Sequence, residues 1–469
     1  MDATFVVIGG GIAGVSCVEG LSFLESDEKT ILISANALVK TVTNVIPLGK
    51  TIMKFDVAEK DFQSIMDRNS SLSVINDVVT LVDTKEKIVE TQRGVKIKFK
   101  KLCLCTGAKP RIIYDNPYVL GIRDTESVET FSKKIINARK IIVVGNGGIA
   151  TEIVHEVENV EIIWVIKDKH ISATFFDPGA AEFFKDKLLK NTPKDTGEEN
   201  ICKRFKYTVI GSKKDSNNVG AALGPDWHES FVMKGQKNNS TKVDIEYECE
   251  IARILNPEEI PANSDWPVHV ELTNGKVIGC DFIVSATGVI PNTDIKGLEE
   301  LKRGDDGGFL VDWKLETSVN DIYAAGDVCS AGWDLAEQWF QMRLWTQAHQ
   351  MGRYAAKSMA STLRGDEFFQ DFCFELFSHV TTFFGYKVVL LGLYNGQKLE
   401  KNHEILLRLT KNLEYIKLVI KDGKLQGAVL IGETDLEEMC ENLILNQLDV
   451  SIYGEDLLNP NIDIEDYFD

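Results

Sequence analysis

The sequence predicts a multidomain α/β protein with two α/β domains of one type and an α+β domain at its C-terminal end. Three observations support this prediction. A buried strand, a glycine-rich turn and a helix occur in that order at the start of the chain. The same arrangement recurs at residues 140–153. The chain has 469 residues, too many for one hydrophobic core.

The first glycine-rich turn follows residues 4–8, whose branched and aromatic side chains are typical of a buried parallel strand. Its three glycines match the dinucleotide-binding fingerprint of a Rossmann-like fold. The first glycine permits the turn, the second lets a pyrophosphate contact the backbone, and the third lets the helix pack on the strand. The following helix would direct the positive end of its dipole at the phosphates. The candidate binding residues are Gly9, Gly11, Ile12, Ala13 and Gly14.

The second glycine-rich turn follows the strand predicted at residues 140–144 and leads into another helix. Here an alanine takes the third small position of the fingerprint. Two such turns in one chain indicate two bound dinucleotides. The candidate residues are Gly145, Gly147, Ala150 and Glu152.

Three later strands end in motifs that suit a flavin protein. Residues 321–327 end in Gly326-Asp327, where a carboxylate can accept hydrogen bonds from the ribityl hydroxyls of a flavin and the glycine admits the backbone. Residues 102–105 lead into Thr106-Gly107, and residues 281–286 lead into a threonine and Gly288. Each Thr-Gly pair suits a crossing between domains.

These motifs, in this order, resemble the FAD-dependent pyridine nucleotide-disulfide oxidoreductase superfamily over residues 5–356. The resemblance implies that the first turn and Asp327 bind FAD and that the second turn binds NAD(P)H, the electron donor. It also implies a discontinuous FAD domain. The expected domains are 1–122 and 289–365 for FAD, 123–288 for NAD(P) with an insertion at about 186–264, and 366–469 for an α+β domain with an acidic tail.

The residues expected at the two riboses depart from the usual pattern. The strand after the first turn ends at Ser34 rather than at an acidic residue, so Ser34 or Asn36 would bind the adenosine ribose. The matching strand of the second fold ends in Lys167-Asp168. A cation favours the 2′-phosphate of NADPH, and a carboxylate favours the free hydroxyl of NADH, so we expect this fold to accept either nucleotide.

The largest departure concerns sulfur. Classical disulfide reductases carry a Cys-x4-Cys pair beside the flavin, yet residues 37–56 contain no cysteine, and the nicotinamide domain has no Cys-x2-Cys. Cys103 and Cys105 face the same side of a strand, with α-carbons about 6.5–7 Å apart, at the edge of disulfide geometry. We expect these two thiols to pack in the core.

Relatives without the dithiol often place a lysine near flavin N5, where a fixed cation stabilises the reduced ring. Lys40 is the candidate, and Lys50 and Lys54 are alternatives. In the superfamily, the helix predicted to start at Gln341 approaches the pyrimidine end of the flavin. Trp345 and Thr346 are therefore expected to contact it.

Composition limits the possible partners. The net charge of −19 argues against direct binding of nucleic acid, and no run of about 18 apolar residues predicts a membrane span. Nine scattered cysteines and the absence of a leader peptide favour the cytoplasm and nucleus. The polar insertion, with Trp227 as an aromatic anchor, and the acidic tail at 461–469 are candidate surfaces for a protein client.

Two functions are compatible with these features. The first is an FAD-dependent NAD(P)H oxidoreductase that acts in oxidative-stress protection and has oxygen, a quinone-like molecule or an oxidised protein group as its acceptor. The second is a redox-gated binding protein whose reduced flavin state controls partner engagement with little turnover. Residues 118–124, 222–228 and 463–469 are similar to a eukaryotic member associated with protecting the tRNA ligase from oxidation, which implies the tRNA ligase complex as the client.

Overall fold

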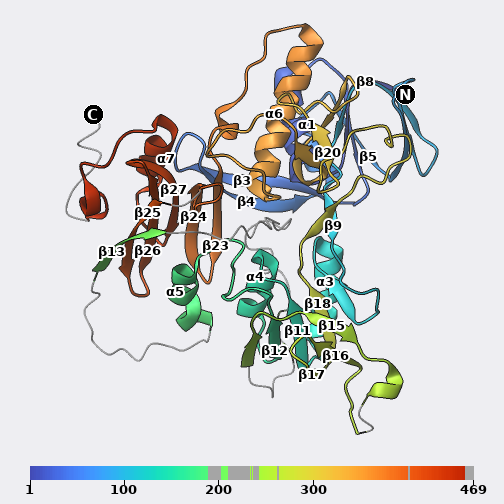
Figure 1. Cartoon of the computed structure of the whole chain (residues 1–469). Coiled ribbons are helices and arrows are strands. Elements are labelled where there is room, and N and C mark those ends of the chain that lie inside the picture. The colour runs from blue at the N-terminus through green and yellow to red at the C-terminus, as the bar shows by residue number, and fades with distance from the viewer. Residues whose placement is uncertain are drawn as a thin grey trace. The chain divides into compact units, whose positions relative to one another are not determined.

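A computed structural model describes residues 1–188, 202–209, 233, 235, 242–260, 263–399 and 402–459. The chain forms two compact units (Figure 1). The first unit contains Met1–Lys109, Ile290–Val380 and Cys440–Asn446, and the second contains Pro110–Val289, Thr381–Met439 and Gln447–Asp469. The predicted anchor Trp227 and the acidic tail at 461–469 lie outside the described residues.

The core of the first unit is a seven-stranded sheet. Its order is β5 (Leu72–Asn76), β2 (Thr30–Ser34), β1 (Asp2–Ile8), β8 (Lys96–Leu104), β7 (Ile88–Thr91) and β6 (Val79–Asp83), and β21 (Ile322–Ala324) also pairs with β8. Five of these strands, β5, β2, β1, β8 and β21, run parallel. Strands β1, β2 and the end of β8 are buried almost throughout, as the sequence predicts for central parallel strands.

Two helices and a hairpin complete the binding part of this unit. Helix α1 (Ile12–Leu24) follows β1 and packs along α6 (Trp345–Arg364), as Figure 1 shows. Strands β3 (Val39–Pro47) and β4 (Met53–Lys60) form an antiparallel hairpin after β2. The smaller elements are α2 (Phe62–Met66), the pair β20 (Phe309–Val311) and β22 (Cys329–Ala331), and the 3-10 turns η2 (Gly326–Val328) and η3 (Phe372–Phe374).

The second unit contains a five-stranded parallel sheet with the second glycine-rich turn. Its order is β10 (Val119–Gly121), β18 (Phe282–Ser285), β11 (Lys140–Val144), β12 (Glu161–Val165) and β14 (Lys242–Glu246). Helices α3 (Thr125–Ile135), α4 (Gly148–Glu156) and α5 (Pro178–Leu188) belong to it. A three-stranded antiparallel sheet contains β15 (Ile251–Ile254), β16 (Val268–Leu272) and β17 (Val277–Cys280). Short strands β9 (Ala108–Pro110) and β19 (Val289–Pro291) lie where the chain crosses between the units.

The C-terminal module is a six-stranded sheet followed by a helix. The order is β13 (Cys202–Val209), β25 (His403–Thr410), β26 (Glu414–Lys421), β27 (Lys424–Ile431), β24 (Tyr386–Gly392) and β23 (Ser378–Phe383). Helix α7 (Glu437–Asn446) follows the last strand of this sheet, and the 3-10 turns η1 (Pro257–Glu259) and η4 (Gly454–Leu458) complete the described elements. The predicted fold class, two Rossmann-like domains and an α+β domain, is confirmed.

The structure differs from the sequence patterns in three places. The stretch 186–264, expected to be a polar loop, contains β13, β14 and β15. Residues 383–391 form an apolar run long enough for one strand, but the run is broken at Phe384 and Gly385, whose φ angles of 52° and 78° make a two-residue hairpin turn. Helix α6 begins at Trp345 instead of Gln341. Among the described helices, none is both long and apolar enough to span a membrane.

Candidate functional site

The first glycine-rich turn is closely packed on one side and open on the other. Gly9 has a φ of 119°, and a methyl group there would lie 2.1 Å from the carbonyl oxygen of Cys105. A methyl group at Gly14 would lie 1.9 Å from the Gly9 carbonyl oxygen. At Gly11, by contrast, a methyl group would meet no atom within 4 Å, and no described side chain caps the helix. The N-terminal amides of α1 are therefore available to an anion, which fits a bound pyrophosphate.

The second turn repeats this geometry in the other unit. Gly145 has a φ of 124°, and a methyl group there would lie 2.1 Å from the Ala286 carbonyl oxygen. Gly147 is the N-cap of α4 and, like Gly11, has no capping side chain in the described chain. Ala150 and Glu152 are buried on α4. The predicted residues of the second turn therefore form a second cradle of the same construction.

The Gly-Asp turn lies against the first glycine-rich turn. A methyl group at Gly326 would lie 2.8 Å from Cβ of Ala13, and one at Gly352 on α6 would lie 2.2 Å from the Ala13 carbonyl oxygen. Ala13 and the Gly326-Asp327 turn, both predicted from the sequence, are thus brought together beside α6. Asp327 is buried, as a ligand of a ribityl chain would be in a closed site.

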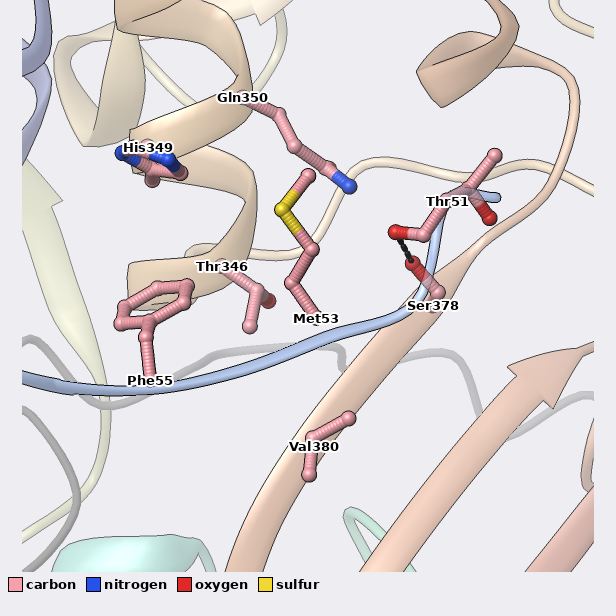
Figure 2. A pocket seen from close by; sticks show the side chains of 8 residues that line it. All are labelled: Thr51, Met53, Phe55, Thr346, His349, Gln350, Ser378 and Val380. Atoms are coloured by element: carbon pink, nitrogen blue, oxygen red, sulfur yellow. Dashed lines mark hydrogen bonds between the residues drawn. The ribbon is translucent and has the colours of Figure 1, made fainter. Parts of the chain in front are cut away.

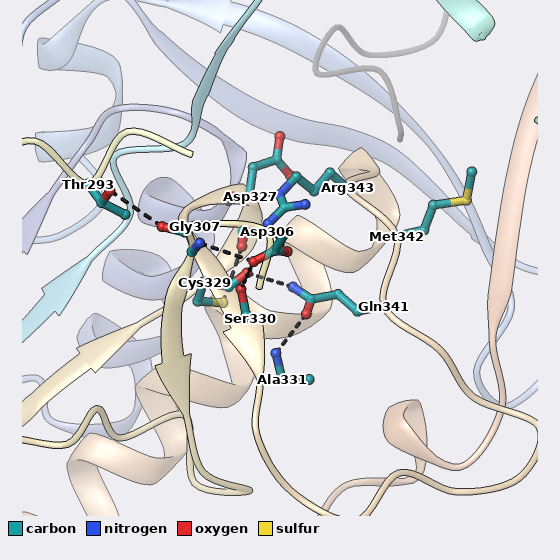
Figure 3. A network of polar contacts seen from close by, with 12 residues as sticks. Thr293, Asp306, Gly307, Asp327, Cys329, Ser330, Ala331, Gln341, Met342 and Arg343 are labelled. Atoms are coloured by element: carbon teal, nitrogen blue, oxygen red, sulfur yellow. Dashed lines mark hydrogen bonds and ion pairs between the residues drawn. The ribbon is translucent and has the colours of Figure 1, made fainter. Parts of the chain in front are cut away.

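A polar network fixes the backbone of this turn (Figure 3). Arg343 donates from Nε to the Asp327 carbonyl oxygen at 2.9 Å and forms an ion pair with Asp306. Burial would raise the pKa of the Asp306 carboxyl, but hydrogen bonds from Ser330 and Arg343 hold this pKa below its ordinary value. Gln341 donates to the Cys329 carbonyl oxygen at 2.8 Å. Gln341 and Arg343 bind this turn, residues 341–344 are not helical, and α6 starts later than predicted.

The Thr-Gly segments take different positions in the two folds. Thr106 donates to the Asn292 carbonyl oxygen at 2.7 Å, and Gly107 accepts from the Asn292 amide at 2.9 Å. The Thr106 hydroxyl is therefore bound within the first unit. Thr106 directly follows Cys105, whose carbonyl oxygen packs against Gly9. Gly288 accepts a hydrogen bond from the Arg111 amide at 2.8 Å in the second unit.

The ribose position of the first fold is shaped by a residue that sequence reasoning missed. Ser34 is buried and donates to the Asn36 carbonyl oxygen at 3.0 Å, while the Asn36 side chain is exposed. Asn76, at the end of the neighbouring strand, donates to the carbonyl oxygens of Ser34 and Asn36, both at 3.0 Å. The burial of Ser34 favours Asn36, the alternative considered with it, as the ribose contact.

The candidate lysines lie on or beside the β3–β4 hairpin. Lys40 is half-buried, pairs across the hairpin with Glu59, and donates its amide to the Gly10 carbonyl oxygen at 2.9 Å. Lys50 is exposed in the loop between the strands, and its amide donates to the buried carboxylate of Glu441 at 2.6 Å. Lys40 is thus held next to the first glycine-rich turn through its backbone.

A pocket lies beside the first turn of α6 (Figure 2). It has about 230 Å³ of empty space, part of it open to solvent. Thr346 lines it and also contacts His379 through a hydrogen bond of 3.0 Å, while Trp345 packs edge-on against the same ring. The lining combines apolar and polar groups: Thr51, Met53, Phe55, Thr346, His349, Gln350, Ser378 and Val380.

His349 is the most unusual group in this pocket. Its Nδ1 lies 2.8 Å from the Ser16 hydroxyl of α1, and its buried Nε2 has no hydrogen-bond partner among the described residues. Burial, with a contribution from the charge of Arg353, lowers the pKa of His349 to about 4. The ring is therefore neutral at pH 7 and keeps one nitrogen for another group.

In the second fold, Asn146 fixes the end of β12. Its amide nitrogen donates to the Asp168 carboxylate at 2.8 Å and to the His170 carbonyl oxygen at 2.9 Å, and its oxygen accepts from the Ser172 amide. Asp168 is half-buried and Lys167 is exposed. Sequence reasoning did not identify Asn146, which lies between Gly145 and Gly147. The only sequence signal for its role in fixing the end of β12 is this position inside the fingerprint.

The thiols of the first unit are clustered and buried. The sulfur atoms of Cys103 and Cys105 are 3.5 Å apart, beyond the covalent distance of about 2 Å. Hydrogen bonds with Cys105 and Cys17, together with burial, raise the pKa of the Cys103 thiol. Both cysteines pack in the core as expected.

Comparisons with known proteins agree with this geometry. The family model described as "Pyridine nucleotide-disulphide oxidoreductase" matches residues 3–193 and 228–352, and a "Rubredoxin NAD+ reductase C-terminal domain" model matches residues 380–448. The chain belongs to the pyridine nucleotide-disulphide oxidoreductase family. It is 50% identical to pyridine nucleotide-disulfide oxidoreductase domain-containing protein 1 of Homo sapiens, over 99% of this chain and 98% of that protein. The protein of the same name from Drosophila melanogaster is 47% identical over 99% of both.

Solved structures share the fold of this family member at low identity. A NAD-dependent persulfide reductase from A. fulgidus matches with a TM-score of 0.66 at 17% identity, over 99% of this chain and 79% of that one. The putidaredoxin reductase–putidaredoxin complex matches with a TM-score of 0.65 at 15% identity, over 95% and 94%. The cofactors of this pyridine nucleotide-disulphide oxidoreductase are FAD and NAD(P)H, and both uncapped cradles fit dinucleotides.

Proposed function

We propose that this oxidoreductase passes electrons from NAD(P)H through FAD to an acceptor outside the chain, without a dithiol of its own. When bound, FAD supplies the capacity to accept a hydride and to donate electrons onward. The chain's own residues bind and orient the two dinucleotides at Gly11 and Gly147, and the Arg343 network holds the Gly-Asp turn. The acceptor would be oxygen, a quinone-like molecule or an oxidised group on another protein.

The observation that carries this proposal is the state of the thiols. Cys103 and Cys105 are the one pair close in sequence, and both are buried behind the first glycine-rich turn. A raised pKa keeps Cys103 protonated at neutral pH, whereas exchange with a disulfide requires a thiolate with access to its target. These two thiols are therefore poor candidates for a redox pair.

An anaerobic titration with NADH tests the proposal. FAD alone takes up two electrons, so one equivalent of NADH should bleach the flavin completely. A flavin coupled to a disulfide would take up a second equivalent. The Cys103→Ser/Cys105→Ser variant should show the same one-equivalent end point as the parent. Two equivalents in the parent and one in this variant would refute the proposal, and no bleaching with NADH or NADPH would refute the oxidoreductase itself.

The same proposal extends to a protective role in the cytoplasm and nucleus, with the tRNA ligase as a client. Its support is the resemblance found in the sequence, including the acidic tail at 461–469. A ligase exposed to an oxidant should lose its activity more slowly when this protein and NAD(P)H are both present. Equal loss with and without the protein would exclude protection. Removal of residues 461–469 should weaken co-purification with the ligase, and unchanged affinity would remove the tail from this role.

A second candidate, redox-gated binding, is favoured by the position of β13. This strand comes from the predicted insertion, yet it pairs antiparallel with β25 of the C-terminal sheet from Cys202 to Val209. The C-terminal sheet therefore contains a strand from the nucleotide-binding part of the chain, and a client bound to this sheet could respond to nucleotide binding. Co-purification that strengthens with NAD(P)H without continuous turnover would support gating. Rapid multiple-turnover reduction of a small disulfide would support a conventional reductase instead.

A further inference from the structure

The loop of residues 166–177, here called the strap, leads from the end of β12 to the start of α5. It carries Lys167 and Asp168, the residues predicted to face the nucleotide ribose. The strap lies in the second unit, and so do all the groups that hold it. Its two ends are fixed by different parts of that unit.

The first end is held by the glycine-rich turn and α4. Asn146 binds Asp168, His170 and Ser172, as described above. Ser172 is fully buried with a φ of 52°, and its hydroxyl lies 2.8 Å from the hydroxyl of Thr151 on α4. A non-glycine residue in this left-handed conformation is uncommon and persists where its surroundings hold it.

The second end is held by the C-terminal sheet. Tyr394 donates from its hydroxyl to the Thr174 carbonyl oxygen at 3.3 Å, and Asn395 donates to the Phe175 carbonyl oxygen at 3.2 Å. The rings of Phe175 and Phe176 are buried and lie 5.4 Å and 5.3 Å from the Phe383 ring, centre to centre. The strap therefore packs on the sheet through both backbone and side chains.

A buried ion pair closes this end. Asp177 binds Lys417 of β26, whose side chain is 2% exposed, and accepts a hydrogen bond from the Tyr415 hydroxyl at 3.0 Å. Lys417 also donates to Asn395 at 2.7 Å. Burial would raise the pKa of Asp177, but the charge and hydrogen bond of Lys417 hold it below its ordinary value. The carboxylate also caps α5 through the Gly179 amide at 2.8 Å.

We propose that Asp177 and Lys417 are positioning residues for nicotinamide nucleotide binding. The C-terminal sheet, through this pair, holds the strap in the shape that presents Asp168 and Lys167 to the ribose. A preorganised loop raises affinity because binding does not have to order it. The inference rests on the proposed role of the second glycine-rich turn in binding NAD(P)H. By linkage, a partner that binds the C-terminal sheet and changes the affinity for the nucleotide must have its own affinity changed by the nucleotide by the same factor.

The test is a double variant that removes the pair without leaving a buried charge. Asp177→Asn keeps a group able to cap α5, and Lys417→Met keeps the volume of the side chain. The matched control is Lys387→Met/Glu437→Gln, because Lys387 and Glu437 form a comparably buried pair 2.9 Å apart in the same module, away from the strap. Titration calorimetry with NAD⁺ on the FAD-loaded protein measures binding without turnover.

We expect the dissociation constant for NAD⁺ to rise roughly three- to tenfold in the Asp177→Asn/Lys417→Met variant and to stay unchanged in the control. The rate of flavin reduction at saturating NADH should match the parent, and amide hydrogen exchange at residues 166–177 should accelerate in this variant alone. Equal dissociation constants in the parent and both variants would overturn the inference. A parent that binds no NAD⁺ would instead refute the proposed nucleotide site.

A single variant covers the case in which the double variant does not fold. Asn395→Ala removes the hydrogen bond to the Phe175 carbonyl oxygen and one contact of Lys417, and leaves the ion pair in place. A rise in the NAD⁺ dissociation constant would support the inference, and an unchanged constant with unchanged exchange in the strap would overturn it.

Discussion

Substitution of Gly11 by alanine should separate cofactor binding from folding. Gly11 has ordinary extended backbone angles, φ −78° and ψ −178°, so alanine fits there without strain. A methyl group would meet no protein atom within 4 Å. It would instead project into the open space over the start of α1, where the pyrophosphate is predicted to approach the backbone.

The expected magnitudes differ sharply between the two states. In the apoprotein, alanine gains about 0.4–1 kcal/mol from reduced freedom of the unfolded chain but is a poorer N-cap than glycine, so the net change stays within about 1 kcal/mol. In the FAD complex, displacement of the pyrophosphate would lose one or two charge-assisted hydrogen bonds. This costs about 2–4 kcal/mol, or roughly a 30- to 1000-fold weaker affinity.

The assay measures the FAD dissociation constant by quenching of flavin fluorescence, and the unfolding free energy of the apoprotein by denaturant titration. Gly14→Ala is the contrasting variant, because its methyl group would lie 1.9 Å from the Gly9 carbonyl oxygen and should destabilise the apoprotein itself. If Gly11→Ala binds FAD as tightly as the parent, the cradle at α1 does not hold the pyrophosphate.

Three further predictions concern other parts of the first unit. Arg343→Leu should weaken FAD binding by about tenfold, because the Gly-Asp turn loses a hydrogen bond and an ion pair; full FAD retention after gel filtration would contradict this. Lys40→Met should slow anaerobic flavin reduction by about 100-fold while Lys50→Met does not, and the reverse order would transfer the role to Lys50. Burial lowers the pKa of His349 to about 4 and that of His379 to about 3, so the unfolded chain binds more protons below about pH 6.5. The free energy of unfolding should be highest above pH 7, where both rings are neutral in the folded and unfolded states. It should fall by about 2 kcal/mol per ring between pH 7 and 5. His349→Asn should make the pH dependence of denaturant unfolding shallower, and an unchanged slope would show that His349 is not buried as a neutral ring.

Local patterns predicted much of the fold. The strand, glycine-rich turn and helix are consecutive in sequence, so residues 4–14 and 140–150 predict both cradles without knowledge of distant contacts. The sequence also shows directly that Ser34 stands where many relatives have an acidic residue. The consequence, the burial of Ser34 and the hydrogen bonds from Asn76, depends on strand β5, whose place beside β2 the sequence does not reveal.

The remaining features depend on contacts between residues far apart in the chain. Asp306 and Arg343 have no sequence signal for their role, because only folding brings them together as an ion pair beside the Gly-Asp turn. Polar residues 202–209 pair with β25 about 200 positions later, and strand pairing at that separation leaves no periodic signal. The hairpin turn at Phe384 has no signal in the sequence, because a large aromatic residue rarely takes a positive φ.

The buried thiols make the two folds separately observable. Cys17, Cys103 and Cys105 lie in the core of the first unit, while Cys249 and Cys280 lie in the core of the second. An alkylating reagent can reach either group only when its own unit opens. Mass spectrometry of the modified peptides would then give two opening rates from one sample, and the effect of each dinucleotide on each rate would show which fold it secures.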